Sequence, residues 1–462
     1  MSFRWTDTEV CGALGIPSEG SEGATHHGVI CTDSRSVKPG DLFLALSGHR
    51  FDGHDFVARA LSLGATGAVV DRPVDAPEGS RLYLVPDTLV ALGDLARHRR
   101  RALTGKVVGI TGSSGKTSTK ELLGAALKGS FRIHVTPGNL NNRIGLPLTL
   151  LSTPHETEVV VLEMGTNEPG EIRALTAMAE PGFGAITTVS ESHLEKLGSL
   201  EGVLEEKLDL FRGLPADGIA LVGDEPPVLE EAARRVLPDV LVIGWNRQSE
   251  PRHRPQSPSV TRGGCYGFQW QGESVELRMP GRHSVQNALL ALALAEALGV
   301  PAAKAAQRIG TVEATGMRSE VRVHGDFTLL VDCYNANPQS LMAALDLLTR
   351  IETSGPRIAV LGSMLELGGH SGELHRAALA TAMSYPLDMV LATGLFAEAA
   401  SGLPAAPDRP ELRVAEGLEE AENILLDSLG ESGVVLLKAS RGVAMERLIP
   451  SLERYFGSGK AA

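Results

Sequence analysis

The chain has 462 residues, of which 43% are hydrophobic and 21% are charged, and its formal net charge is −13. This length exceeds what one hydrophobic core accommodates and fits about two to four domains, and the composition excludes disorder as the main state. The negative charge argues against nucleic-acid binding, because the average field repels an anionic partner.

Four cysteines lie far apart in the chain, at Cys11, Cys31, Cys265 and Cys333. They lack the C-x-x-C spacing of a zinc site and favour a reducing compartment over a disulfide framework. The first residues, "MSFRWTDTEV", contain no apolar signal segment, and no window approaches the roughly 18 consecutive apolar residues of a membrane span. We therefore expect a cytoplasmic protein that does not cross a membrane.

The first part of the chain, residues 1–103, mixes short apolar runs with two helical patterns. Strands are predicted at residues 28–33, 41–46, 66–71 and 81–86, and helices at 53–64 and 88–103. The second helix ends in His98, Arg99, Arg100 and Arg101, cations that suit the negative end of a helix dipole, and we predict a solvated helix end there. These elements predict a small α/β domain.

From residue 104 to residue 314, β-branched runs alternate with helical patterns, which predicts a buried and mostly parallel sheet. The runs lie at residues 106–111, 158–165, 183–189 and 218–223. Residues 246–264 are rich in Pro, Arg and Ser and are predicted to form an exposed loop. A helical pattern at 283–299 leads towards a second domain junction near residue 315.

Residues 315–462 repeat this alternation, with apolar runs at 326–332, 357–363, 387–394 and 433–440. Asn337 followed by Pro338 predicts an N-cap and the first position of a helix. The third domain is therefore predicted to be a second doubly wound, Rossmann-like unit. The predicted fold class is α/β with three domains, spanning residues 1–103, 104–314 and 315–462.

The segment "VVGITGSSGKTSTKELL", residues 107–123, has the features of a phosphate-binding loop between a strand and a helix. Gly112 and Gly115 allow backbone N–H groups to face phosphate oxygens at a helix N-terminus. Lys116 adds positive charge, and the Thr117 hydroxyl is a ligand type for Mg²⁺. The strict motif needs glycine at position 110, where this chain has Ile110, while Gly109 comes one residue early. The strand–loop–helix context nevertheless favours phosphate binding over an ordinary turn.

Three further residues suggest what surrounds the phosphates. Glu163 ends an apolar run, and a carboxylate at the C-terminal end of a buried parallel strand lies at the ligand edge of the sheet. His193 follows the next predicted strand, and Lys207 lies in the helical pattern behind it. Each residue alone fits a structural role, and their shared location favours a role at the phosphate site.

At these residues the chain resembles the Mur ligase family, ATP-dependent amide-forming enzymes of peptidoglycan precursor synthesis. "GITGSSGKTSTKE" resembles the ATP loop of the family, "ESHLEKLGS" and "EGVLEEKLDL" its histidine and modified-lysine segments, "GRHSVQNALLALALA" its adenine-side segment and "LLKASRGVAME" its C-terminal lysine motif. "DSRSVKPGDLFLALSG", "FDGHDF", "TPGNLNNRIGLPLTLL", "DCYNANPQSL" and "LGSMLELG" resemble the family member that adds D-alanyl-D-alanine to UDP-N-acetylmuramoyl-tripeptide.

The resemblance implies a set of site residues, with ATP and Mg²⁺ as cofactors. For ATP it implies Gly112, Ser113, Ser114, Gly115, Lys116, Thr117, Ser118, His283, Asn287, Arg318 and Asp332. For metal it implies Thr117, Glu163, His193 and Lys207, the last as an N-carbamate that turns a cation into a carboxylate ligand. Lys116, His193 and Lys207 would be catalytic. For substrate it implies Ser34, Arg35, Asn139, Asn142, Asn335 and Asn337. The expected partners are the two small-molecule substrates, and the expected state is a monomer.

Three residues depart from the family pattern. Ser284 stands where the family has asparagine, Ser363 replaces the aspartate of "LGDMLELG", and Ala439 replaces the glycine of "KGSR". Three other functions fit the residues. The first is another amide ligase of the superfamily, which adds the third residue or makes folylpolyglutamate. The second is a nucleotide-driven module that acts on a protein partner, and the third is a purely binding or structural role.

Overall fold

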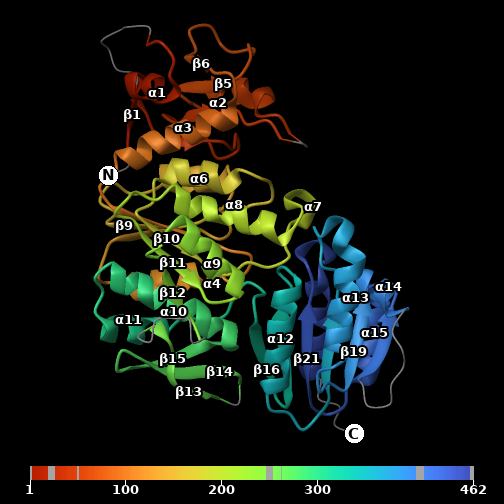
Figure 1. Ribbon diagram of the computed structural model, residues 1–462. Helices are drawn as coiled ribbons and strands as arrows, with labels where there is room; N and C mark the ends of the chain where they lie inside the picture. The colour runs from red at the N-terminus through yellow and green to blue at the C-terminus, as the bar shows by residue number, and fades with distance from the viewer. Residues whose placement is uncertain are drawn as a thin grey trace.

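The computed structural model describes residues 3–18, 26–48, 51–245, 253–261, 263–401 and 410–457. Three α/β domains follow one another along the chain, with the N-terminal domain at one end of the molecule and the C-terminal domain beside the central one (Figure 1). None of the helices in these ranges combines the length and the apolar character that crossing a bilayer requires.

The N-terminal domain has a parallel sheet in the order β3-β4-β5-β6 and a short antiparallel pair, β1-β2. Its strands are β1 (Trp5–Thr6), β2 (His26–His27), β3 (Ile30–Cys31), β4 (Leu42–Leu44), β5 (Gly67–Val70) and β6 (Leu82–Leu84). Its helices are α1 (Asp7–Leu14), the 3₁₀ turn η1 (Gly53–Phe56), α2 (Val57–Ser62) and α3 (Thr88–Arg101). The predicted strands are confirmed. Helix α1 was not predicted, although Thr6 and Glu9 form a capping box at its start.

The arginines at the end of α3 are not solvated as predicted. Arg99 is buried and donates to Thr153 O at 2.6 Å. Arg100 donates to Ala179 O at 2.8 Å, at the end of a helix of the central domain. The prediction of a solvated helix end was wrong for these two residues, because their guanidinium groups donate hydrogen bonds to carbonyl oxygens of the central domain.

The central domain is built on a six-stranded parallel sheet in the order β12-β11-β10-β7-β9-β8. Its strands are β7 (Lys106–Thr111), β8 (Ile133–Val135), β9 (Val159–Glu163), β10 (Phe183–Ile186), β11 (Ile219–Gly223) and β12 (Leu241–Ile243). Its helices are α4 (Lys116–Leu127), α5 (Gly145–Leu151), α6 (Glu171–Ala179), α7 (Leu194–Leu197), α8 (Leu200–Arg212), α9 (Pro227–Val236), α10 (Arg282–Ala297) and α11 (Ala302–Ile309). The predicted parallel sheet is confirmed.

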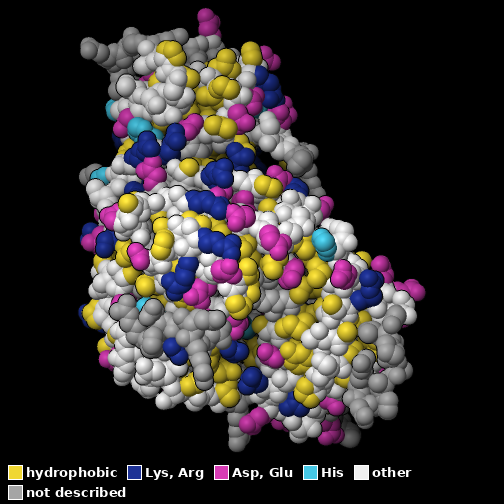
Figure 2. Space-filling view, viewed as in Figure 1, with side chains coloured by type: hydrophobic (Ala, Val, Ile, Leu, Met, Phe, Trp, Pro, Cys, Tyr) yellow, Lys and Arg dark blue, Asp and Glu magenta, His cyan; other side chains and the backbone are white. Residues whose placement is uncertain are grey.

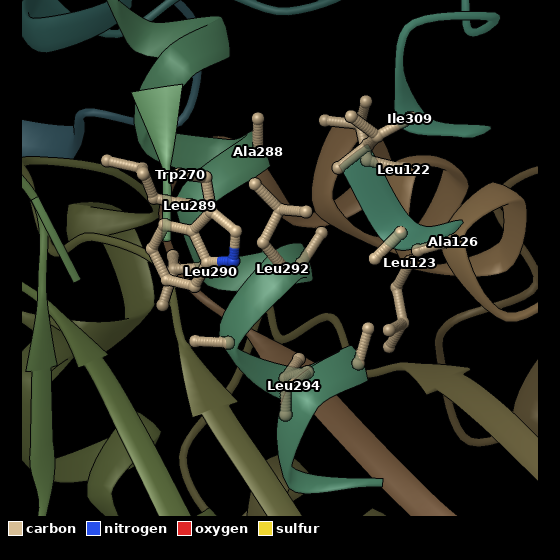
Figure 3. Packing of buried hydrophobic residues seen from close by; sticks show 14 of the residues in the cluster. Leu122, Leu123, Ala126, Trp270, Ala288, Leu289, Leu290, Leu292, Leu294 and Ile309 are labelled. Atoms are coloured by element: carbon tan, nitrogen blue, oxygen red, sulfur yellow. The ribbon is translucent and has the colours of Figure 1, made fainter. Parts of the chain in front are cut away.

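Both faces of this sheet are buried, which explains its continuous β-branched runs. Val108 and Ile110 of β7 face a core formed with α4, α10 and α11, whereas Val107 faces the core on the other side. Figure 3 shows Leu289, Leu290 and Leu292 of α10 in the first core, with Leu122 and Leu123 of α4 close by. Packing against α10 therefore fixes α4, whose first residue is Lys116 of the phosphate-binding loop.

An antiparallel sheet, β13-β14-β15, was missed by the sequence analysis. It comprises β13 (Gln256–Val260), β14 (Cys265–Trp270) and β15 (Glu273–Pro280). The predicted loop at 246–264 was therefore wrong for 256–260, while residues 246–252 and 262 lie outside the described residues. The side chains of β13 are all exposed, so its sequence carries no apolar alternation.

The C-terminal domain has a six-stranded sheet in the order β16-β17-β21-β18-β19-β20, parallel except at β16. Its strands are β16 (Glu320–His324), β17 (Phe327–Asp332), β18 (Arg357–Leu361), β19 (Met389–Thr393), β20 (Glu411–Ala415) and β21 (Gly433–Lys438). Its helices are α12 (Pro338–Arg350), η3 (Gly368–His370), α13 (Ser371–Ala382), α14 (Leu395–Ala400), α15 (Leu418–Ser428), η4 (Arg441–Val443), η5 (Met445–Leu448) and α16 (Ile449–Gly457). The second doubly wound unit is confirmed, and Asn337 is the N-cap of α12 as predicted.

Basic side chains on the molecular surface are interspersed with acidic ones. Figure 2 shows Lys and Arg next to Asp and Glu on the face formed by the N-terminal and central domains. Arg101 lies 2.6 Å from Glu180, and Arg173 lies 3.2 Å from Asp209. These cations are thus neutralised by carboxylates of the chain itself.

Candidate active site

A cleft of about 550 Å³ lies where the phosphate-binding loop faces the C-terminal domain. Such a volume is typical of small-molecule sites. Most of the residues expected at the site line this cleft: Ser113, Ser114, Gly115, Lys116, Thr117, Ser118, Asn139, Asn142, Glu163, His193, His283, Asn287, Arg318, Asp332, Asn335 and Asn337. The two domains thus bring together segments that are more than two hundred residues apart in the sequence.

The loop between β7 and α4 depends on two glycines. Gly115 is the N-cap of α4 and has φ 82°, a left-handed conformation that L side chains adopt at a cost. A Cβ there would lie 2.3 Å from Asn287 Oδ1, and a Cβ on Gly112 would lie 1.9 Å from Thr187 Oγ1. Only glycine fits at both positions, so α10 and the end of β10 can approach the loop closely.

The loop is further held by Ser113 and Lys116. The backbone N–H of Ser113 donates to Thr188 O at 2.8 Å, and its hydroxyl donates to Ser190 O at 3.2 Å. The Lys116 ammonium donates to Gly112 O at 2.6 Å. Burial lowers the pKa of Lys116, and the Glu163 carboxylate partly offsets this effect. The ammonium therefore lies folded into the loop that it is expected to serve.

Glu163, at the end of β9, is buried at 1% exposure. Its Oε1 accepts from Asn141 Nδ2 at 2.7 Å, and its Oε2 lies 3.7 Å from Lys120 Nζ without a hydrogen-bond partner. A buried carboxylate oxygen that faces a phosphate-binding loop and lacks a donor fits a cation ligand. Asn141 and Lys120 were missed by the sequence analysis. Lys120 lies one helical turn after Lys116 on α4, so its spacing from Lys116 in the sequence would have placed it near the loop.

Lys207 of α8 is buried outside the cleft lining. Burial lowers its pKa well below the usual value, and nearby Lys116 lowers it further. Within the described parts of the chain, no three His, Cys, Asp or Glu side chains are grouped to hold a metal ion. A cation here would therefore need oxygens from phosphate or from a modified lysine in addition to Glu163 and Thr117.

His193 lines the cleft and also contacts the third domain, where its Nδ1 lies 2.5 Å from Glu366 Oε2. His283 is partly buried, its Nε2 lies 3.2 Å from Ser319 Oγ, and burial lowers its pKa. The imidazole of His283 thus lies between the central and C-terminal domains.

The third domain contributes a charged pair. Lys438 Nζ donates to Asp332 Oδ2 at 2.7 Å, with both groups buried. Arg318 lies over the ring of Tyr334, 3.8 Å from its centroid, which is a cation–π contact. Tyr334 and Lys438 also line the cleft. Neither was assigned a site role from the sequence, although Lys438 lies in the C-terminal lysine motif and Tyr334 in the segment "DCYNANPQSL".

Two polar contacts join the third domain to the loop region of the central domain. Asn337 Nδ2 donates to Ser114 Oγ at 3.3 Å, and Thr188 Oγ1 donates to Gln339 Oε1 at 2.6 Å. Ser34 and Arg35 do not line the cleft, and Arg35 instead forms an ion pair with Asp33 at 2.8 Å in the N-terminal domain. The structure therefore gathers the predicted nucleotide residues and leaves the N-terminal pair apart.

The three departures from the family pattern have local partners. Ser284 Oγ donates to Pro280 O at 2.6 Å, and Ser363 Oγ accepts from Leu395 N at 3.0 Å. Ala439 is fully buried, and its Cβ lies 2.9 Å from the position that a Cβ on Gly362 would take. All three side chains thus have close neighbours within their own domain.

Comparison with known proteins defines the class to which this fold and cleft belong. Models of the Mur ligase family match residues 26–100 (Mur ligase family, catalytic domain), 110–295 (Mur ligase middle domain) and 317–441 (Mur ligase, glutamate ligase domain). The chain belongs to the Mur ligase family.

Individual relatives are more specific. The UDP-N-acetylmuramoyl-tripeptide–D-alanyl-D-alanine ligase of Bacillus subtilis is 36% identical over 92% of this chain and 93% of its own length. A crystal structure of MurF from Acinetobacter baumannii has a TM-score of 0.88 at 31% identity, covering 98% of this chain and 99% of that one. The Thermotoga maritima MurF ligase in complex with ADP has a TM-score of 0.80 at 28% identity, covering 93% and 98%.

Proposed function

We propose that this chain uses ATP to join D-alanyl-D-alanine to UDP-N-acetylmuramoyl-tripeptide in peptidoglycan precursor synthesis. The observation that carries the proposal is the single cleft in which the phosphate-binding loop, Glu163 and the third-domain residues Asn335 and Asn337 meet. A nucleotide and an incoming amine can therefore be held at the same place. Relatives that carry this activity in their names match over nearly the whole chain.

The chemistry requires activation of a carboxylate, because oxide is too poor a leaving group for direct amide formation. Transfer of the γ-phosphoryl group to the tripeptide carboxylate gives an acyl phosphate. The dipeptide amine then attacks the carbonyl carbon, and the tetrahedral intermediate expels phosphate. The chain's main tasks are to position these groups and to neutralise their charge.

We assign the phosphate contacts to Lys116 and to the backbone N–H groups of residues 112–118. Thr117 and Glu163 would hold one Mg²⁺, and His193 and carbamylated Lys207 a second. When bound, these ions would neutralise phosphate charge. The orphaned Glu163 Oε2 supports the first assignment. For Lys207, a lowered pKa favours the neutral amine, which is the form that adds CO₂.

The remaining assignments follow the cleft. His283, Asn287, Arg318 and Asp332 would contact the nucleotide, Asn139 and Asn142 the central part of the muramyl substrate, and Asn335 and Asn337 the dipeptide. Ser34 and Arg35 would contact the UDP end, which requires a substrate that extends beyond the cleft to the N-terminal domain. We further propose domain boundaries after residues 103 and 314, a monomeric state and a cytoplasmic location, the last in line with four cysteines that form no disulfide.

The test is product analysis by mass spectrometry with ATP, D-Ala-D-Ala and the diaminopimelate- or lysine-containing UDP-muramoyl-tripeptide supplied separately. We expect one pentapeptide product and, with an ¹⁸O-labelled tripeptide carboxylate, one label atom in the released phosphate. Phosphate release that needs neither tripeptide nor amine would favour a nucleotide-driven module, and a product formed without label transfer would refute the acyl-phosphate route. A panel with other amino acids and glutamate separates this activity from those of the other amide ligases.

A further inference from the structure

His193 is held from the C-terminal domain by Glu366, a residue to which we have so far assigned no role. Glu366 lies between β18 and η3, and its Oε2 is 2.5 Å from His193 Nδ1, an ion-pair distance without the geometry of a hydrogen bond. Its backbone oxygen accepts from Glu195 N at 3.2 Å. The side chain and the backbone of Glu366 therefore both contact the segment that begins α7, and Figure 1 shows α7 beside the C-terminal domain.

The backbone at this contact is strained on both sides. Among the described residues, eight that are not glycine have positive φ, and they include His193 at 54° and Glu366 at 65°. Such conformations cost free energy and persist where surrounding contacts hold them, often at functional sites. A half-exposed ion pair contributes little to stability, so it does not by itself account for two strained residues that meet.

The imidazole of His193 has one nitrogen at Glu366, and the residue lines the cleft. Histidines that ligate metals usually donate their second ring N–H to a carboxylate or carbonyl. That donation fixes the tautomer and turns the other nitrogen's lone pair towards the ion. Glu366 does not itself line the cleft, so it acts on the site only through His193.

We propose that Glu366 is a positioning residue: its carboxylate lies at Nδ1 of His193, accepts the Nδ1–H when the imidazole binds a cation, and so directs Nε2 towards the cation beside the phosphates. Because Glu366 belongs to the C-terminal domain and His193 to the central domain, docking of the third domain completes the cation site. This inference rests on the proposed function, in which His193 is a cation ligand. The cation site is then complete only when the third domain, which carries Asn335 and Asn337, is docked on the central domain.

The experiment measures Mn²⁺ binding by electron paramagnetic resonance, with the full-length protein, ADP and Mn²⁺. Glu366→Ala should weaken Mn²⁺ binding about tenfold to a hundredfold. Glu366→Gln, whose amide oxygen can still accept the Nδ1–H, should lose less. The matched control is Glu168→Ala. The Glu168 carboxylate pairs with Lys196 of α7, the helix that His193 caps, but it does not pair with His193 itself. This control should bind Mn²⁺ like the wild type.

A second readout is the tautomer of His193, from ¹⁵N shifts of histidine-labelled protein assigned with His193→Gln. We expect Nδ1 protonated in the wild type and in Glu366→Gln, and a mixture in Glu366→Ala. Unchanged Mn²⁺ affinity in a folded Glu366→Ala, or a wild type protonated at Nε2, would overturn the inference about Glu366. The proposed ligase function would still stand. Unchanged affinity in His193→Gln would instead remove His193 from the cation ligands of the proposed function.

Discussion

The substitution Gly115→Ala tests the close contact between the phosphate-binding loop and α10. The new methyl group would lie 2.3 Å from Asn287 Oδ1, more than 1 Å inside an ordinary contact of 3.4–4 Å. Either Asn287 or the loop must move. The left-handed backbone adds about 1–2 kcal/mol for any residue other than glycine. A displaced loop loses one or more hydrogen bonds to charged phosphate, each worth about 1.5–3 kcal/mol, so ATP binding should weaken by about ten- to hundredfold.

The matched control is Gly170→Ala. Gly170 is also an N-cap glycine of the central domain, with φ 84° against 82° at Gly115. An added Cβ there meets no atom within 4 Å. Both variants should lose the stability that the left-handed backbone costs a non-glycine residue. Gly115→Ala should lose more because of the clash, and only Gly115→Ala should lose affinity for ATP in calorimetry. If both variants bind ATP like the wild type, close packing of Asn287 on the loop does not shape the phosphate site.

Three further outcomes are expected. Lys207→Ala should lose most of the ligase rate, and a short carboxylic acid added to the assay should restore part of it; full activity without the acid would exclude a catalytic Lys207. Lys438→Met should cost about 3–5 kcal/mol in urea denaturation, because it leaves the buried Asp332 carboxylate unpaired, and Asp332→Asn in the same chain should recover part of that loss. Burial lowers the pKa of His375, whose Nε2 accepts from Met364 N at 2.9 Å, so as the pH falls through about 6.5 the unfolded chain takes up the proton before the folded chain does. Stability should therefore fall as the pH is lowered from 7.5 to 5.5, and His375→Gln should flatten that dependence; an equal slope in both proteins would contradict this reasoning.

Much of the fold could be predicted from the hydrophobic patterns of the sequence. Strands buried on both faces, such as β7 and β9, need continuous β-branched runs, and these were recognised. The missed sheet shows the converse, because β13 is exposed along its whole length and its residues therefore carry no hydrophobic signal. Its partner β14 directly follows the segment rich in Pro, Arg and Ser and was not separated from it.

The site divides in the same way. Lys116 was found because it follows a glycine-rich loop between a strand and a helix, and Glu163 because it ends a recognisable strand, where the topology determines the location. Asn141 and Glu366 were not found, since their importance depends on contacts across loops or domains. Residue spacing along one chain segment does not encode such distances, so these contacts required the three-dimensional structure.

The buried arginines of α3 determine which part of the molecule can move. Arg99 and Arg100 donate to carbonyls of the central domain, and Ala96 and Leu103 pack in the central core. An interface that combines buried apolar side chains with hydrogen bonds resists rotation more than the third domain's contacts do, which are mainly polar, although Leu374 packs on the central core. Different conformers of this chain should therefore superpose over the first two domains as one body, and their divergence should begin after residue 314.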